Sequence, residues 1–119
     1  MAEDFEKVFK RLKPILQTFE SNLTVKFNEP GKYYLISNKP FNKRELWFGG
    51  VEIKKNYVSF HLVPLYMFPE LLDDISPELK KRMQGKACFN FKNADDKIFA
   101  DLANLTSKSF EFLRQKEII

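Results

Sequence analysis

The residues best able to do chemistry in this sequence are one histidine and one cysteine, His61 and Cys88. A single pair cannot supply the four nitrogen and sulfur ligands of a structural zinc site, so we expect no such site within the chain. A Cys–His nucleophilic pair is available, and Lys86 shares the face of Cys88 in an alternating segment, which would lower the pKa of the thiol. A lone cysteine in a strand is more commonly a small apolar filler, and we therefore expect a non-catalytic domain.

Acidic and glycine-containing motifs do not identify a cofactor, and we expect none. The densest acidic set is Glu70, Asp73, Asp74 and Glu78. Their spacing can place two carboxylates on one face of a helical turn, as a hard cation requires, but acids also favour helix N-termini because they complement the helix dipole. Gly85-Lys86 resembles the end of a phosphate-binding loop, yet Ala87 replaces the required Ser or Thr.

A polar sheet face is the candidate binding site. Two alternating segments place polar side chains on one side of neighbouring strands, and aromatic residues flank them. One histidine on such a face suits a small, anionic ligand, whose identity no motif specifies. The candidate ligand-binding residues are Trp47, Tyr57, His61, Tyr66, Lys86 and Cys88. The alternative interpretation is a solvated sheet face on which His61 makes one structural hydrogen bond.

The distribution of charge and aromatic residues leaves nucleic-acid binding as a weaker interpretation. The net charge is +4, and the basic excess falls in residues 32–55, with six basic and two acidic residues, and in residues 80–86. Aromatic residues accompany the first segment, as in proteins that hold single strands by stacking: Tyr33, Tyr34, Phe41 and Trp47. Because no RNP-type motif is present, we do not expect nucleic acid as the partner. The sequence does not show whether the two basic segments converge.

Hydrophobic periodicity predicts the elements that must position these residues. An apolar stripe predicts a helix over residues 5–19, which Pro14 should kink or divide. Alternation predicts strands near residues 23–27, 33–37, 44–54, 57–63 and 86–91. A second stripe predicts a final helix, with Asn93 as its N-cap. Between the last two strands, Ser76 and Pro77 begin a short helix that Gly85 should end.

The turn between the third and fourth predicted strands specifies their register. If Lys55-Asn56 is the turn, Val51 faces Phe60 on one side of the sheet, and Gly50 faces His61 on the other. His61 then lies opposite a residue without a side chain. The pair Gly49-Gly50 also suggests a bulge or a close approach by another group.

Together these elements predict one α+β domain spanning residues 1–119, with no linker or repeat. Its antiparallel sheet has about five strands, N- and C-terminal helices packed on it, and short helices between strands four and five. The sequence contains no stretch of about 20 apolar residues, so we expect no membrane partner. It contains a single cysteine, which cannot form an internal disulfide, so we expect a cytoplasmic location. Phe41 and Trp47 could mark a homodimer interface.

A longer pattern resembles a known family. The run LWFGGVEIKKNYVSFHLVPLY, followed by PELLDDISPELKKRMQGKACFNF and a closing helix, resembles the YdhG-like family, domain of unknown function 1801. The corresponding pieces are residues 51–62, 77–84 and 85–91, and the resemblance covers residues 46–112. It implies an α+β fold similar to frataxin-like iron chaperones, and some members are described as intracellular iron chaperones.

The resemblance also implies an alternative metal site. Iron binding of the frataxin kind uses an acidic ridge on the first helix and the adjoining strand, where this chain has Glu3, Asp4, Glu6 and Glu20. The first three are the candidate metal ligands of this alternative. Basic residues are interleaved with these acids, and each nearby ammonium or guanidinium opposes a bound cation: Lys7, Lys10, Arg11 and Lys13. This chain therefore departs from the family pattern at the residues that would bind Fe²⁺.

Overall fold

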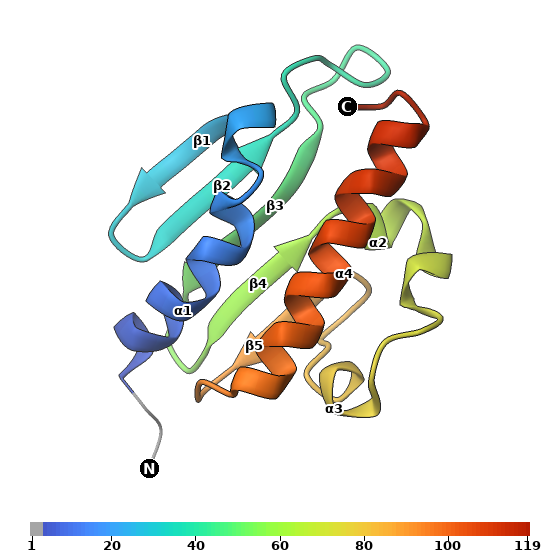
Figure 1. Cartoon of the computed structure of the whole chain (residues 1–119). Helices are drawn as coiled ribbons and strands as arrows, with labels where there is room; N and C mark the ends of the chain where they lie inside the picture. Colours follow the sequence, from blue (N-terminus) through green and yellow to red (C-terminus); the bar gives the residue numbers. More distant parts are fainter. Residues whose placement is uncertain (1–3) are drawn as a thin grey trace.

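A computed structural model describes residues 4–119 as one antiparallel sheet with helices packed against it (Figure 1). The elements are, in order, α1 (Phe5–Gln17), η1 (Glu20–Asn22), β1 (Thr24–Glu29), β2 (Lys32–Ile36), β3 (Trp47–Ile53), β4 (Val58–Leu62), α2 (Pro64–Met67), η2 (Pro69–Leu72), α3 (Pro77–Lys80), β5 (Cys88–Phe91) and α4 (Asp96–Gln115). The predicted α+β class, with terminal helices and short helices between strands four and five, is confirmed.

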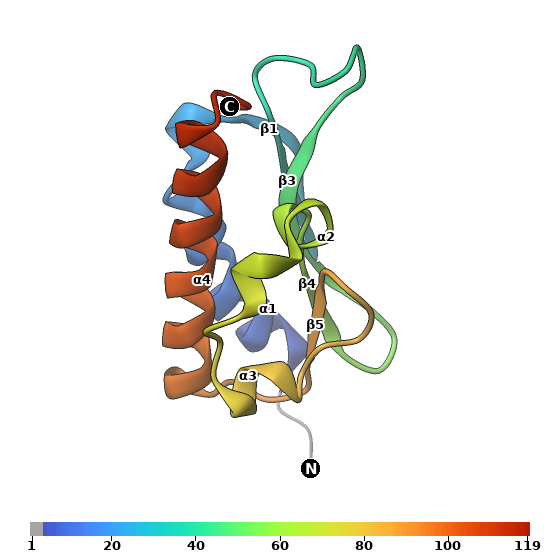
Figure 2. The same ribbon diagram turned by 90° about the vertical axis from the view of Figure 1, so that its right-hand side faces the viewer.

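The five strands lie side by side in chain order, β1-β2-β3-β4-β5, and each runs antiparallel to its neighbour. The two long helices, α1 and α4, lie on the same side of this sheet (Figure 2). Within residues 4–119, neither long helix covers the opposite side, which we call the helix-free face. The sheet therefore has one face in the core and one face available to other groups.

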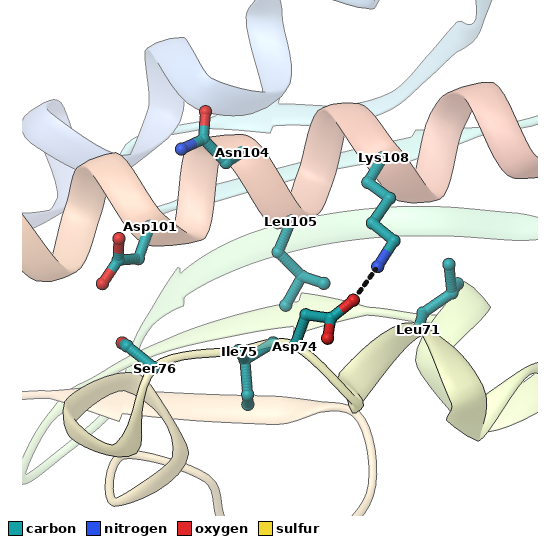
Figure 3. Close-up of a pocket in the computed structure, with 8 residues that line it drawn as sticks. All are labelled: Leu71, Asp74, Ile75, Ser76, Asp101, Asn104, Leu105 and Lys108. Atoms are coloured by element: carbon teal, nitrogen blue, oxygen red, sulfur yellow. Dashed lines mark ion pairs between the residues drawn. The ribbon is translucent and has the colours of Figure 1, made fainter.

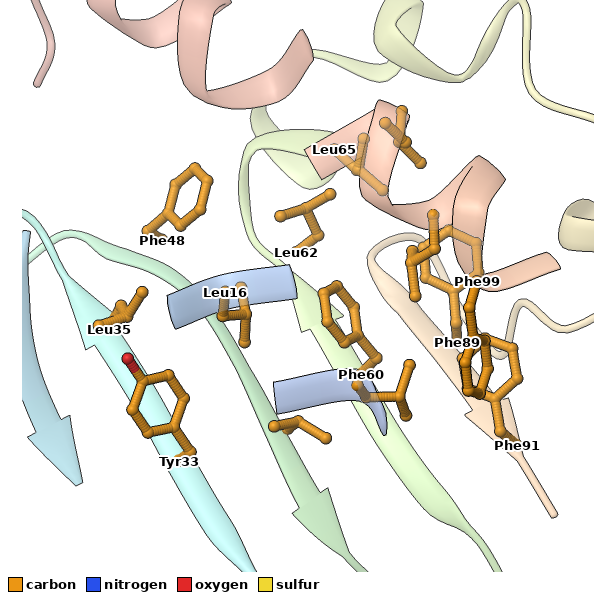
Figure 4. Packing of buried hydrophobic residues seen from close by; sticks show 14 of the residues in the cluster. Leu16, Tyr33, Leu35, Phe48, Phe60, Leu62, Leu65, Phe89, Phe91 and Phe99 are labelled. Atoms are coloured by element: carbon orange, nitrogen blue, oxygen red, sulfur yellow. The ribbon is translucent and has the colours of Figure 1, made fainter. Parts of the chain in front are cut away.

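The core fills the space between the sheet and the two long helices. Every second residue of β4 and β5 points into it, and Phe60 and Phe89 are completely buried there (Figure 4). Helix α1 contributes the buried Leu12 and Leu16, and α4 contributes Leu102 among others. Full burial of each such side chain contributes roughly 1.5–3 kcal/mol, so this shared core holds all the layers together.

Two tight turns connect neighbouring strands, and the second of them is the turn predicted from the sequence. Gly31 connects β1 to β2 with a φ of 77°, a left-handed conformation that glycine adopts without strain. Between β3 and β4, the backbone N–H of Lys54 donates to the carbonyl of Tyr57 at 2.8 Å, so Lys55-Asn56 forms the turn. The register follows as predicted, with Val51 opposite Phe60 and Gly50 opposite His61.

The connection from β2 to β3 contains a tight turn that overlaps the predicted start of the third strand at Arg44. Phe41 and Arg44 exchange two backbone hydrogen bonds, of 2.8 and 3.0 Å, around Asn42 and Lys43, whose φ angles are 52° and 65°. Positive φ at both central positions defines a type I′ turn. Strand β3 therefore begins at Trp47 and not at Arg44, because residues up to Arg44 close this turn instead.

Three further predictions about helices need correction. Helix α1 is not divided: it continues through Pro14 to Gln17, because this proline lies in the last turn and forfeits a single backbone hydrogen bond. The N-cap of α4 is Asp95, whose carboxylate accepts from the N–H of Ile98 at 3.0 Å, and not Asn93. Helix α3 has its predicted Ser76 cap but ends at Lys80, before the left-handed Gly85.

Candidate functional site

One row of residues crosses all five strands on the helix-free face. From β1 to β5, each member is the cross-strand partner of the next: Phe27 with Tyr34, Tyr34 with Gly50, Gly50 with His61, and His61 with Cys88. Directly opposed residues point to the same side of a sheet. Because the alternate residues of these strands lie in the core, this cross-strand row points away from α1 and α4.

Tyr34 fills the gap that the sequence analysis placed opposite His61. Its ring lies so close over Gly50 that a methyl group at that position would overlap with it. The Tyr34 hydroxyl donates to Glu52 Oε1 at 2.9 Å, and Lys54 Nζ lies 3.3 Å from the other carboxylate oxygen. Burial, followed by the hydrogen bond to Glu52, raises the pKa of Tyr34 well above its ordinary value. The predicted close approach at Gly50 is thus made by the protein itself.

His61 and Cys88 are in direct contact, Nε2 to Sγ, across β4 and β5. Burial, with the positive charge of Lys54, lowers the pKa of His61. Burial also raises the pKa of Cys88, although a hydrogen bond with Ser59 and the charge of Lys54 oppose the change. At neutral pH the pair is therefore a neutral imidazole beside a neutral thiol, which is not the ionised arrangement of a thiol nucleophile.

The prediction that Lys86 lowers the pKa of Cys88 is wrong. Strand β5 begins at Cys88 itself, so Lys86 lies in the preceding turn and not on the strand. Its ammonium lies instead 5.8 Å from the centre of the Tyr66 ring, in α2. Lys54 is the lysine whose charge acts on Cys88.

Trp47 forms an aromatic cluster with two members of the cross-strand row, Phe27 and Tyr34. The rings of Phe27 and Trp47 are stacked with centroids 6.1 Å apart, and Tyr34 meets Trp47 edge-on at 5.6 Å. Lys32 Nζ lies 4.1 Å from the centre of the Phe27 ring, within the range of a cation–π interaction. We call these residues, Phe27, Lys32, Tyr34 and Trp47, the aromatic face.

A separate cavity lies at the sheet edge, beyond the end of β4. It has a volume of about 500 Å³ and lies between the α2–η2 segment and the chain entering β5. Tyr66 stands at this cavity with 66% of its surface exposed, beside Lys86. We call this cavity the edge pocket; it is lined by Leu65, Tyr66, Pro69, Leu72, Met83, Gly85 and Lys86.

The six residues predicted to bind a ligand therefore do not form one site. Trp47, His61 and Cys88 belong to strands of the helix-free face, whereas Tyr66 and Lys86 belong to the edge pocket. Tyr57 is half-buried in the turn before β4. The helix-free face also includes residues outside the six predicted to bind a ligand, namely Phe27, Tyr34 and Glu52. Alternation alone could have found them once the pairing of β2 with β3 was known.

A smaller cavity, of about 160 Å³, lies between α4 and the chain before α3 (Figure 3). Its carboxylate Asp74 lies 3.5 Å from Lys108 Nζ, so an ammonium already neutralises it. Asp101 and Asn104 line the same cavity from α4. This arrangement is an exposed ion pair between α4 and the chain before α3, and among residues 4–119 it is not part of a set of three possible metal ligands.

The residues of the alternative iron site are only partly described. Glu3 lies outside the described residues, and the Asp4 carboxylate accepts from the N–H of Glu6 at 2.9 Å as the N-cap of α1. Within residues 4–119, no three His, Cys, Asp or Glu side chains gather in a way that could hold a metal ion.

Comparisons with known proteins do not place this chain in a family. It matches no protein-family model, no curated protein and no solved structure. The resemblance to the YdhG-like family therefore stays a prediction. In the part of the chain that the structure describes, no helix has the length and apolar character needed to cross a membrane.

Proposed function

We propose that this chain is a non-catalytic binding domain that takes a small organic anion in the edge pocket. The observation that carries the proposal is the combination of shape and charge there. The volume of about 500 Å³ falls within the range of small-molecule sites. Of the described residues that line the pocket, Lys86 is basic and none is acidic.

The walls of the edge pocket favour a ligand with an apolar body and one anionic group. Leu65, Leu72 and Met83 supply apolar surface, and methionine adapts to irregular shapes because its side chain is unbranched and polarisable. The exposed Tyr66 ring offers a flat surface for a second ring. The Lys86 ammonium would pair with a carboxylate or a phosphate monoester at the rim.

The absence of catalysis is supported by the state of His61 and Cys88. Both are held in their neutral forms near pH 7 by burial, so the thiolate needed for nucleophilic attack is disfavoured. Neither residue lines the edge pocket. Lys86, which would bind the ligand, is therefore separate from His61 and Cys88, the side chains that could react.

Thermal denaturation with small acids tests this proposal. Benzoate, indole-3-acetate and phenyl phosphate are the probes, and benzamide is the uncharged control. A bound ligand at 100 times its Kd stabilises the folded state by about 2.7 kcal/mol, which raises the Tm by several degrees in a domain of this size. We expect at least one acid to raise the Tm while benzamide does not.

Matched variants locate the binding. Lys86→Gln and Tyr66→Leu should abolish the shift, whereas Lys92→Gln, which removes another exposed lysine between β5 and α4, should retain it. Equal loss of the shift in Lys86→Gln and Lys92→Gln would contradict the edge pocket as the site. No shift with any acid at millimolar concentration would contradict the proposal itself.

A further inference from the structure

The positive charge of the chain is concentrated in the first three strands and their connections. Residues 24–57 contain seven basic and three acidic residues, a net charge of +4 that equals the net charge of the whole chain. The basic residues are Lys26, Lys32, Lys39, Lys43, Arg44, Lys54 and Lys55. The rest of the molecule is balanced, so a polyanion would be drawn to this part of the surface.

Part of this charge lies directly beside aromatic rings. Lys32 Nζ is 4.1 Å from the centre of the Phe27 ring and 6.0 Å from that of Tyr34. The type I′ turn at Asn42 and Lys43 lies in the connection of residues 37–46. Figure 2 shows that this connection extends past the end of the sheet, on the side away from the long helices. Basic side chains thus lie both on the aromatic face and on a projecting loop next to it.

A groove continues the aromatic face toward that loop. It has a volume of about 430 Å³ and shares Trp47 with the aromatic face. Phe41 and Met67 contribute further apolar walls, and Arg44 lies among the lining residues. Trp47 therefore connects a stacked ring surface on one side to a groove with a guanidinium on the other.

We propose that the aromatic face and this groove bind single-stranded nucleic acid. Bases would stack on Trp47 and Phe41, while Lys32, Lys43 and Arg44 would contact phosphates. Proteins that bind single strands without sequence preference combine these two features, ring surfaces for bases and a basic track for the backbone. This proposal rests on the helix-free face and is independent of the edge pocket.

Charge complementarity favours a nucleic acid over a second copy of this chain as the occupant. A second copy would bring the same excess of positive charge to the interface, and like charges placed opposite each other oppose association. Two of the three acids in residues 24–57 are already paired, Glu45 with Lys26 at 2.9 Å and Glu52 with Lys54 at 3.3 Å. The phosphates of a nucleic-acid backbone would supply the negative charge that balances the basic excess of residues 24–57.

Intrinsic fluorescence provides the test, because Trp47 is the single tryptophan of the chain. Twelve-nucleotide strands of thymidylate and of uridylate are titrated into the full chain at several salt concentrations. We expect quenching of Trp47, since a base stacks on its ring. Three phosphate contacts predict a slope of log K against log salt of about −2, at roughly −0.7 per contact for single strands.

Two variants separate the contributions of charge and stacking. Lys43→Asn with Arg44→Gln removes two cations, and asparagine tolerates the left-handed backbone at position 43. This double variant should reduce the magnitude of the salt slope to about 0.7. Trp47→Leu, measured by anisotropy of a labelled strand, should weaken binding by roughly 5- to 150-fold, the effect of losing one stacked base.

The matched control is Lys80→Gln with Lys81→Gln, which removes two exposed cations at the end of α3. It should bind as the unchanged chain does, and circular dichroism should show that every variant folds. Equal weakening by both double variants would overturn the proposal, as would an absence of binding at 20 mM salt. A dimer seen by light scattering, with a change in Trp47 fluorescence as the dimer forms, would assign the surface to a second copy instead.

Discussion

At the scale of single residues, Tyr34 is central to the environment of His61 and Cys88. Its ring lies over Gly50, the cross-strand partner of His61, and a negative charge on Cys88 would raise the pKa of the Tyr34 hydroxyl further. The Tyr34 side chain therefore reaches from β2 toward β5 across the helix-free face. Exclusion of water from this region disfavours the charged forms of both His61 and Cys88.

The lowered pKa of His61 predicts a loss of stability in mild acid. Because the folded-state pKa lies below the ordinary 6.5, the unfolded chain binds a proton more readily than the folded chain. The contribution of His61 is complete above pH 6.5 and is lost as the pH falls from there through the folded-state value. We expect urea unfolding at pH 5.5 to give a lower stability than at pH 7.5.

Replacement of the imidazole isolates this effect. In His61→Gln the difference in stability between pH 7.5 and pH 5.5 should shrink, because the remaining carboxylates titrate in both proteins alike. Proton NMR of the ring in the unchanged chain should give a midpoint below 6.5. A midpoint at or above 6.5 would show that burial does not dominate at His61.

At the scale of elements, the glycine pair of β3 is explained by packing on both faces of one strand. A Cβ at Gly49 would lie 2.9 Å from the carbonyl oxygen of His61 and 3.1 Å from Leu16 Cδ2, on the side of α1. A Cβ at Gly50 would overlap with the Tyr34 ring on the opposite side. The two glycines thus allow a helix and a tyrosine to approach the same strand closely.

We predict that Gly50→Ala destabilises the fold through Tyr34. Overpacking of this kind typically costs about 1–3 kcal/mol, because the displaced ring must leave its position and its hydrogen bond to Glu52. The measurement is the free energy of unfolding in urea for Gly50→Ala, Tyr34→Ala and the double variant. The cost of Gly50→Ala should be much smaller in the Tyr34→Ala background. An equal cost in both backgrounds would place the strain in the backbone of β3.

Elements were predicted well where local chemistry decides them and less well where several residues compete. The Ser76 cap and the Lys55-Asn56 turn depend on residues within a few positions of each other. The N-cap of α4 was misplaced because Asn93 and Asp95 both have suitable side chains, and the sequence pattern does not rank them.

At the scale of the whole molecule, the two long helices and the sheet share one core. Side chains from α1, from α4 and from all five strands belong to the same cluster or pack against it. Trp47 lies in β3 and packs with Phe27 and Tyr34 of the aromatic face, whereas α1 and α4 lie across the sheet (Figure 2). The strands lie between the two sides of the molecule and contribute side chains to both.

We predict that both sides unfold together. A domain with one continuous core usually unfolds in a single cooperative step, so no part should survive when the core is lost. Urea unfolding followed by Trp47 fluorescence and by far-ultraviolet circular dichroism, which reports mainly on the helices, should give the same midpoint. Two separated midpoints would indicate that the aromatic face and the helices belong to independent units.

The sequence alone determined the α+β class, the chain order of the elements and the register of β3 with β4. These features follow from short-range periodicity and turn chemistry, which depend on residues close together in the chain. It also identified His61 opposite Gly50, which the structure confirms.

Only the tertiary structure decided what surrounds His61 and where a ligand could bind. The pairing of β2 with β3 depends on the loop of residues 37–46 and on a bulge, which together bring Tyr34 over Gly50. Tyr66 follows β4 and Lys86 precedes β5, so both residues lie outside the strands, where they line the edge pocket. Such contacts join residues far apart in the chain, so they depend on packing and not on local pattern.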